Sequence, residues 1–142
     1  MSQNDPNPVD FCNVAALLSD DERALQQTMA AFVNEKVIPI ASKSFDAGVF
    51  PRELVADLAQ AGVFGCKGMN SVSYGLICQE LERGDAGIRT FVSVQSSLVM
   101  QPIAEYGSNA QQEKWLPLLA SGGAIGCFAL TEVQGGSDLG NM

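Results

Sequence analysis

A short segment near the C-terminal end of the sequence carries the residues best suited to binding a cofactor. Phe128, Leu130 and Thr131 stand in an apolar run, and Gly136 and Ser137 follow in a glycine-rich loop. Alternate residues of a strand can wall a flat ring system such as a flavin, and glycines with a serine allow close backbone approach and hydrogen bonds. The alternative is a strand that ends in a solvated turn. The spacing alone favours this alternative.

The residue types that are missing exclude several kinds of chemistry. The sequence contains no histidine, which removes Ser-His-Asp and Cys-His catalysis and the commonest zinc ligand. We expect no metal site. The four cysteines form no C-x-x-C pair, so we expect small buried residues in a reducing compartment. These cysteines are Cys12, Cys66, Cys78 and Cys127.

Composition and charge narrow the class of protein. The chain has 142 residues, 46% of them hydrophobic, which suits a globular domain with one sizeable core. The formal net charge of -8 disfavours nucleic acids and anionic membranes as partners. No apolar stretch approaches the roughly 20 residues that span a bilayer, and no signal peptide is visible. We therefore expect a cytoplasmic protein, or a mitochondrial matrix protein whose transit peptide has been removed.

Helical patterns fill most of the chain before the cofactor-binding segment. Ser19 with Glu22 and Ser108 with Gln111 match capping boxes, which predict helix starts. Apolar residues then recur at helical spacing, and prolines and glycines mark ends or kinks. The expected helices cover residues 20–38 with a continuation past Pro39 to 48, 51–61, 72–83 with Ser71 as cap, 86–106 with Asp85 as cap and an interruption at Pro102, and 109–120 with a kink at Pro117.

The pattern changes after the last helix. A breaker at residues 121–124 precedes Ile125 to Thr131, a short apolar run that predicts a strand. One strand without a partner cannot satisfy its backbone hydrogen bonds, so we expect the sequence to stop inside a larger protein. The predicted organisation is a polar tail at 1–12, an all-α helical domain at 13–122 and the start of a truncated β-domain at 123–142.

The C-terminal segment also resembles a known signature. Residues 128–138, Phe-Ala-Leu-Thr-Glu-Val-Gln-Gly-Gly-Ser-Asp, are similar to the flavin-contacting strand of acyl-CoA dehydrogenases, Leu-Thr-Glu-Pro-x-x-Gly-Ser-Asp. Similar stretches cover residues 80–89, 93–100, 104–108 and 112–117, and the resemblance extends from about Phe11 onward. It implies a helical N-terminal domain, a middle β-domain and a C-terminal four-helix domain, usually in a tetramer. It also implies FAD as cofactor, contacted by the five residues named first.

The stretch around Arg89 is most similar to glutaryl-CoA dehydrogenases, whose substrate carries a second carboxylate. The resemblance implies that Arg89 binds this distal carboxylate through its charged fork, with Glu82 beside it and Ser93 lining the pocket. The three residues differ by seven and four positions, so they share a helical face if the two helices are nearly continuous. The alternative is a surface ion pair between Arg89 and Asp85. Without the resemblance, this alternative is strongly favoured.

The resemblance further implies a reaction for the complete enzyme. A glutamate removes the α-proton of the acyl-CoA, the β-hydrogen leaves as hydride to the flavin, and loss of CO2 gives crotonyl-CoA. Electrons then pass to electron-transfer flavoprotein. The family's base lies beyond Met142, so no catalytic residue is assigned in this chain, and Glu132 is expected to be structural. The fragment alone is expected to be inactive. The alternatives are a stand-alone helical binding module and an acyl-CoA dehydrogenase of other substrate preference.

Two positions depart from the family pattern. Val133 stands where the family usually has proline, so the turn after Glu132 is less constrained. The loop between Gly65 and Ser71 is also shorter than is usual in the family, because it consists of residues 66–70 alone. In relatives this loop borders the acyl-CoA site. The pocket is therefore expected to differ from theirs at this point.

Overall fold

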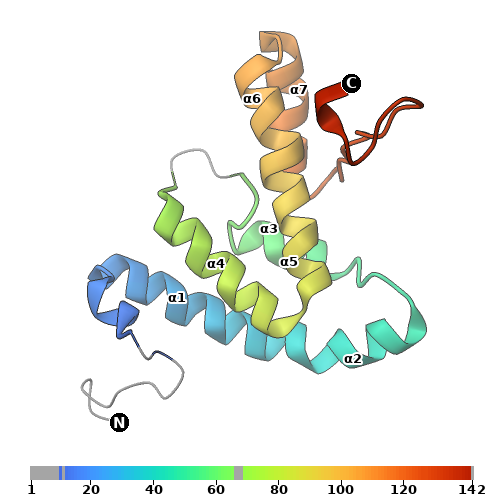
Figure 1. Cartoon of the computed structure of the whole chain (residues 1–142). Helices are drawn as coiled ribbons and strands as arrows, with labels where there is room; N and C mark the ends of the chain where they lie inside the picture. Colours follow the sequence, from blue (N-terminus) through green and yellow to red (C-terminus); the bar gives the residue numbers. More distant parts are fainter. Residues whose placement is uncertain (1–9, 11, 66–68, 142) are drawn as a thin grey trace. The chain divides into compact units, whose positions relative to one another are not determined.

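The chain folds into two compact units, and the computed structural model describes residues 10, 12–65 and 69–141. Unit 1 comprises Met1–Pro51 and Gly68–Arg89, and unit 2 comprises Arg52–Lys67 and Thr90–Met142. Both units are built from helices (Figure 1), and no β-strand occurs among the described residues. The predicted all-α class is confirmed. The predicted division at residues 12 and 122 stays a prediction, and most of the polar tail lies outside the described residues.

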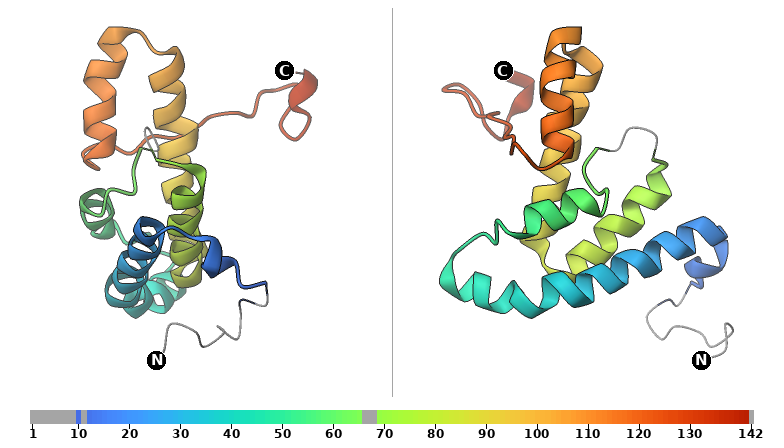
Figure 2. Two further views of the ribbon diagram at one scale, coloured as in Figure 1. Left: turned by 90° about the vertical axis from the view of Figure 1, so that its left-hand side faces the viewer. Right: turned by 180° about the vertical axis from the view of Figure 1, so that it is seen from behind.

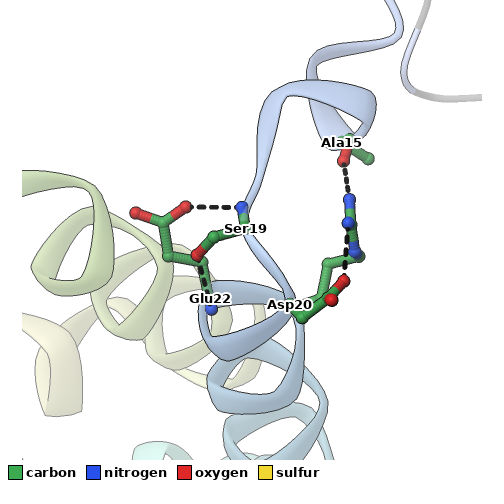
Figure 3. Close-up of polar contacts among 5 residues, drawn as sticks. Ala15, Ser19, Asp20 and Glu22 are labelled. Atoms are coloured by element: carbon green, nitrogen blue, oxygen red, sulfur yellow. Dashed lines mark hydrogen bonds and ion pairs between the residues drawn. The ribbon is translucent and has the colours of Figure 1, made fainter.

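The first long helix, α1 (Asp20–Phe32), begins at the predicted capping box. The Ser19 Oγ atom accepts from the Glu22 N–H (3.3 Å), and Glu22 Oε2 accepts from the Ser19 N–H (2.8 Å), as Figure 3 shows. Arg23 donates to the carbonyl oxygen of Ala15, in the short turn η1 (Val14–Leu17) before the helix. The helix start is thus held by reciprocal local hydrogen bonds, as the sequence predicts.

The capping box makes the stability of unit 1 depend on pH. Hydrogen bonds from the Ser19 backbone N–H, and then from its hydroxyl, hold the pKa of Glu22 below its ordinary value. Because the folded pKa is the lower one, this stabilisation is complete above the ordinary glutamate pKa and is lost as the pH falls through the folded value.

A Glu22→Gln variant tests this dependence, because glutamine keeps an acceptor for the Ser19 N–H but does not titrate. We expect the variant to melt at a lower temperature than the original chain at pH 7, and the gap to shrink at pH 3. Thermal melts followed by circular dichroism measure both gaps. A gap that stays the same at the two pH values would contradict the proposed contribution of the ionised carboxylate.

Pro39 does not end the first helix, because one wide turn precedes it. The π-turn η2 (Val33–Val37) joins α1 to α2 (Ile38–Ala47), and the Ile38 N–H donates to Val33 O, five residues back. The extra residue in this turn relieves the clash that a proline ring makes with the carbonyl four residues earlier. The helix therefore continues to Ala47, as the predicted continuation requires.

The helix α4 (Ser71–Gly84) lies beside α1 in unit 1, with both helices running in the same direction (Figure 1). Its cap is Asn70, and not Ser71 as the sequence suggested. The Asn70 Oδ1 atom accepts from the Ser73 N–H (2.7 Å), and its Nδ2 atom donates to Glu22 (3.3 Å). One asparagine therefore caps α4 and ties its start to the start of α1, a tertiary contact that helical spacing does not reveal.

The other end of α4 packs closely against η2 through Gly84. A Cβ atom at Gly84 would lie 2.6 Å from Val33 Cγ1 and 3.0 Å from Val37 Cγ1, and both valines are buried. Arg83 strengthens the same contact by donating to Asn34 Oδ1 (3.0 Å). Only a residue without a side chain allows this approach, because close-packed interiors do not absorb an added methyl group without shifts.

Gly84→Ala is expected to destabilise the fold by about 1–3 kcal/mol, the usual cost of overpacking. Gly75 in the same helix provides a matched control, because a Cβ atom there would meet nothing within 4 Å. We expect Gly75→Ala to stabilise by roughly 0.5–1 kcal/mol, since alanine is the better helix former. Urea unfolding of the two variants should give opposite signs. Equal effects would refute the close packing at Gly84.

Unit 2 contains most of the long helical run that follows Asp85, from Thr90 onward. The π-turn η3 (Val94–Met100) again precedes a proline, Pro102, and the Gln101 N–H donates to Ser96 O, five residues back. The run therefore passes Pro102 without a break. A capping box at Ser108 then starts the antiparallel helix α7, which continues through Pro117 (Figure 2). The elements are α3 (Leu54–Gln60), α5 (Ala86–Ser93), η3 (Val94–Met100), α6 (Gln101–Tyr106) and α7 (Asn109–Ala120).

The predicted strand at residues 125–131 is not formed. These residues belong to no helix or strand, and the chain continues to the short turn η4 (Leu139–Asn141). A strand requires a ladder partner, and the described part of the chain offers none. The prediction of buried cysteines is also wrong here, because Cys127 on this extended segment is exposed. Cys12 is exposed and Cys78 is half-buried, whereas Cys66 lies outside the described residues.

Candidate functional site

The predicted carboxylate-binding residues Arg89 and Glu82 meet in unit 1. The Arg89 Nε atom donates to Glu82 Oε2 at 2.5 Å, and their side chains are 36% and 48% exposed. In the described part of the chain, the two Nη atoms of Arg89 have no hydrogen-bond or ion-pair partner. Glu82 thus holds one edge of the guanidinium fork, and the remaining donors are available to a planar carboxylate.

A bend brings these two side chains together. Asp85 has an extended backbone (φ -163°, ψ 122°) between α4 and α5, so the two helices are not continuous as the spacing argument assumed. The Asp85 Oδ1 atom instead accepts from the Ile88 N–H (2.8 Å) and caps α5. Asp85 is thus the helix cap, as predicted, and it does not form the surface ion pair with Arg89 that was the alternative. The partner of Arg89 is Glu82.

The ion pair with Glu82 favours the charged form of Arg89 and orients its side chain. The hydrogen bond that Arg89 donates to Glu82, and then the negative charge of Glu82, raise the pKa of the Arg89 guanidinium above its ordinary value. Arginine is already protonated throughout the physiological range, so the pair mainly fixes the direction of the side chain. Ser93 lies one helical turn further along α5 and is half-buried. A separation of four positions puts Arg89 and Ser93 on the same side of that helix.

The predicted flavin-binding residues lie on the extended segment of unit 2. Phe128 and Leu130 are 50% and 38% exposed, and Thr131 and Ser137 are also exposed. Among the described residues, the backbone N–H groups of 127–131 have no backbone partner. The segment therefore presents apolar side chains together with backbone donors that have no backbone partner among the described residues, two features that suit a flat, polar-edged ring system.

A tight turn brings two of these residues into contact. The backbone N–H and carbonyl groups of Glu132 pair with those of Gly135, at 2.8 and 3.4 Å. As a result, a Cβ atom at Gly136 would lie 3.3 Å from Thr131 Cγ2. Glu132 is exposed and its backbone closes the turn, which fits the expected structural place of this residue. The turn forms although Val133 replaces the proline that is usual in the family.

Gln95 has a role that the sequence pattern does not predict. Helical spacing puts Gln95 on the apolar face of its helix, together with Ile88 and Val92, and its side chain is 1% exposed. Its Nε2 atom donates to Leu119 O (3.1 Å) and Ala124 O (2.9 Å), and its Oε1 atom accepts from the Gly126 N–H (3.0 Å). A glutamine within an apolar stripe is the signal that could have revealed it, because a buried amide needs partners.

An apolar groove of about 630 Å³ lies within unit 2. Phe64, Met100 and Leu116 contribute to its lining, and Gln101 donates to Glu105 (2.9 Å) along it. The described residues around the groove include no basic side chain, so it does not suit a carboxylate. Gly65 also lines this groove, and the loop predicted to border the acyl-CoA site follows it in the sequence. Its residues 66–68 lie outside the described residues.

Other kinds of site are not found in the part of the chain that the structure describes. No group of three or more cysteine, aspartate and glutamate side chains there could hold a metal ion. Of the helices that the structure describes, none has the length and apolar character that crossing a membrane requires. The candidate groups in the described chain are the Arg89 guanidinium in unit 1 and the exposed apolar side chains of Phe128 and Leu130 in unit 2.

Comparisons with known proteins find relatives over most of the chain. A family model described as "Acyl-CoA dehydrogenase, N-terminal domain" matches residues 19–123. The chain is similar to a crystal structure of a glutaryl-CoA dehydrogenase from Mycobacterium smegmatis in complex with FADH2, with 44% identity and a TM-score of 0.89. That match covers 95% of this chain and 37% of the other.

Two further relatives have names that point to other acyl-CoA substrates. The butyryl-CoA dehydrogenase of Megasphaera elsdenii is 30% identical with a TM-score of 0.77, over 87% of this chain and 35% of that one. The human mitochondrial short-chain specific acyl-CoA dehydrogenase is 32% identical, over 87% of this chain and 32% of its own length. The present chain spans about a third of these relatives. Because the family model covers most of its residues, the chain belongs to the acyl-CoA dehydrogenase family, whose helical N-terminal domain it carries.

Proposed function

We propose that this chain is the N-terminal part of an FAD-dependent acyl-CoA dehydrogenase that oxidises and decarboxylates glutaryl-CoA to crotonyl-CoA. The observation that carries the proposal is the Arg89 guanidinium, which Glu82 holds by one edge while the other donors remain available. The similarity to a glutaryl-CoA dehydrogenase at 44% identity supports the same substrate. In the complete protein, two further domains would supply the base and most of the flavin site.

The negative net charge of the chain makes a local basic group such as Arg89 necessary for binding an anionic substrate. A protein of formal net charge -8 repels a dicarboxylate substrate unless a local basic group receives it. Arg89 can donate two parallel hydrogen bonds to a planar carboxylate, and its charge does not vary in the physiological pH range. Ser93, one turn further along α5, would add a hydroxyl to the same pocket. We therefore assign the distal carboxylate to Arg89, with Glu82 as the residue that orients it.

The extended segment fits a flavin. Phe128 and Leu130 are exposed beside backbone donors that lack backbone partners in the described chain, and Gly136 packs directly on Thr131. These residues would wall the ring system and hydrogen bond to its polar edge, and Ser137 would serve as a further donor. When bound, FAD supplies the acceptor for the β-hydrogen of the substrate. We propose electron-transfer flavoprotein as the next acceptor and a homotetramer as the assembly.

A second candidate is a dehydrogenase of monocarboxylic acyl-CoA substrates. The similarity to short-chain specific and butyryl-CoA dehydrogenases favours it, because these matches also cover 87% of the chain. The two candidates differ in what Arg89 must do. A monocarboxylic acyl chain offers no charge to this residue, whereas a glutaryl group does.

Anaerobic titration of the complete flavoprotein distinguishes the two candidates. We expect glutaryl-CoA to bleach the visible flavin band and to release one CO2 for each crotonyl-CoA formed. Butyryl-CoA serves as the matched substrate, since it differs chiefly by the absence of the distal carboxylate. Faster bleaching by butyryl-CoA, or oxidation of glutaryl-CoA without CO2, would reject the glutaryl assignment and retain the family chemistry.

A further inference from the structure

The buried side chain of Gln95 connects the long helix of unit 2 to the segment that follows α7. All three of its hydrogen bonds reach backbone atoms between residues 119 and 126, at 2.9 to 3.1 Å. The donors go to carbonyl groups on either side of the turn after α7, and the acceptor receives the N–H of Gly126. One carboxamide therefore satisfies three backbone groups of a segment that has no ladder of its own.

Close packing at Gly126 reinforces this connection. A Cβ atom at Gly126 would overlap the side chain of Val99, which lies in η3 one helical turn after Gln95. The segment is thus held against the helix by one set of polar bonds and one contact that only glycine allows. Beyond this point the chain is extended, and Phe128 follows two residues later.

The neighbouring residue Ser96 has a different task. Its Oγ atom donates to Val63 O (3.3 Å) and accepts from the Gly65 N–H (3.2 Å), and it is 1% exposed. Consecutive residues on a helix point in directions about 100° apart, so they reach different segments. Gln95 and Ser96 are equally buried and lie in the same π-turn, but in the described structure it is Gln95 that hydrogen bonds to the segment leading to Phe128, whereas Ser96 bonds to Val63 and Gly65.

We propose that Gln95 is a positioning residue for FAD binding: it holds the segment after α7 against η3, and thereby places the predicted flavin-contacting residues 128–137. The proposal rests on the function proposed above and extends it to a residue that would not touch the cofactor. Without the carboxamide, the segment around Gly126 would lose the hydrogen bonds that order it. The conformational entropy lost when FAD orders this segment would then oppose flavin binding.

Gln95→Met and Ser96→Ala form the test pair, because both remove buried hydrogen bonds from the same turn. In the complete flavoprotein, we expect Gln95→Met to weaken FAD binding at least about tenfold, as fits the loss of several hydrogen bonds to one segment. Ser96→Ala should change FAD affinity by no more than about twofold, even if it lowers the melting temperature as much as Gln95→Met does or more. FAD affinity is measured by fluorescence titration of the apoprotein, at a temperature where circular dichroism shows both variants folded.

Amide hydrogen exchange in the 142-residue chain gives a second readout that does not depend on flavin. We expect Gln95→Met to accelerate exchange at Gly126 by about tenfold or more, and Ser96→Ala to leave it unchanged. Unchanged exchange at Gly126, or equal losses of FAD affinity in both variants, would overturn the positioning role. Absence of FAD from the wild-type protein would instead reject the function proposed above, and the exchange rates would still decide whether Gln95 fixes the segment.

Discussion

Replacing Arg89 by alanine in the complete protein is expected to lower kcat/KM for glutaryl-CoA by about 100-fold, as is usual when one partner of a charged, hydrogen-bonded pair is lost. The value for butyryl-CoA should stay within about twofold, because that substrate has no distal carboxylate to bind. The reason is structural: Glu82 directs the guanidinium, and the removal of Arg89 leaves a carboxylate of the protein facing a carboxylate of the substrate. Steady-state kinetics with both substrates measures the difference.

Two further variants control for loss of charge and for loss of fold. Arg89→Lys keeps the charge but not the planar fork, so an intermediate loss is expected. Arg23→Ala removes an exposed arginine that pairs with Asp20 on α1, and both substrates should react as before. If Arg89→Ala lowered kcat/KM equally for glutaryl-CoA and butyryl-CoA, the carboxylate-binding role would be wrong. Arg89 would then be better described as a surface residue in an ion pair.

The 142-residue chain is expected to show no dehydrogenase activity by itself. Removal of an α-proton requires a positioned base, and general base catalysis typically contributes 10²- to 10⁴-fold to a rate. No catalytic base is assigned in this chain, and the chain spans only 37% of its glutaryl-CoA dehydrogenase relative. Reduction of an electron acceptor by glutaryl-CoA should therefore stay at the background rate.

The control for this prediction is the complete protein, assayed at equal molar concentration with added FAD. Under the same conditions it should reduce the acceptor at a rate far above background. Detectable glutaryl-CoA-dependent reduction by the pure 142-residue chain would show that the catalytic base lies within these residues. The search for it would then start with the carboxylates of unit 2, such as Glu105.

The features that could be predicted from the sequence are those set by local interactions. Capping at Ser19 and Ser108 depends on residues three positions apart, so the motif and the hydrogen bonds coincide. The cap at Asp85 and the end of the first helical run at Gly48 follow from residue types with strong backbone preferences. Helical spacing also puts Leu58 and Ile77 on apolar faces, and both are buried, whereas Leu98, which the same spacing puts on such a face, is 45% exposed.

The features that were missed depend on tertiary contacts or on small shifts of backbone geometry. The π-turns before Pro39 and Pro102 allow both helices to continue, and no pattern in the sequence distinguishes such a turn from a break. Glu82 and Arg89 were expected on one continuous helical face, but a bend at Asp85 brings them together. Gln95 was assigned to an apolar face because its three backbone partners are more than twenty residues away in the chain.

The subunit mass of the natural protein, measured with its visible absorption spectrum, tests the central claim most directly. We expect a subunit of about 40 kDa, the size that three domains of ordinary length imply, and a flavin band in the same sample. The claim is that these residues form the helical part of a larger flavoenzyme. A colourless natural protein of 15.0 kDa would contradict it.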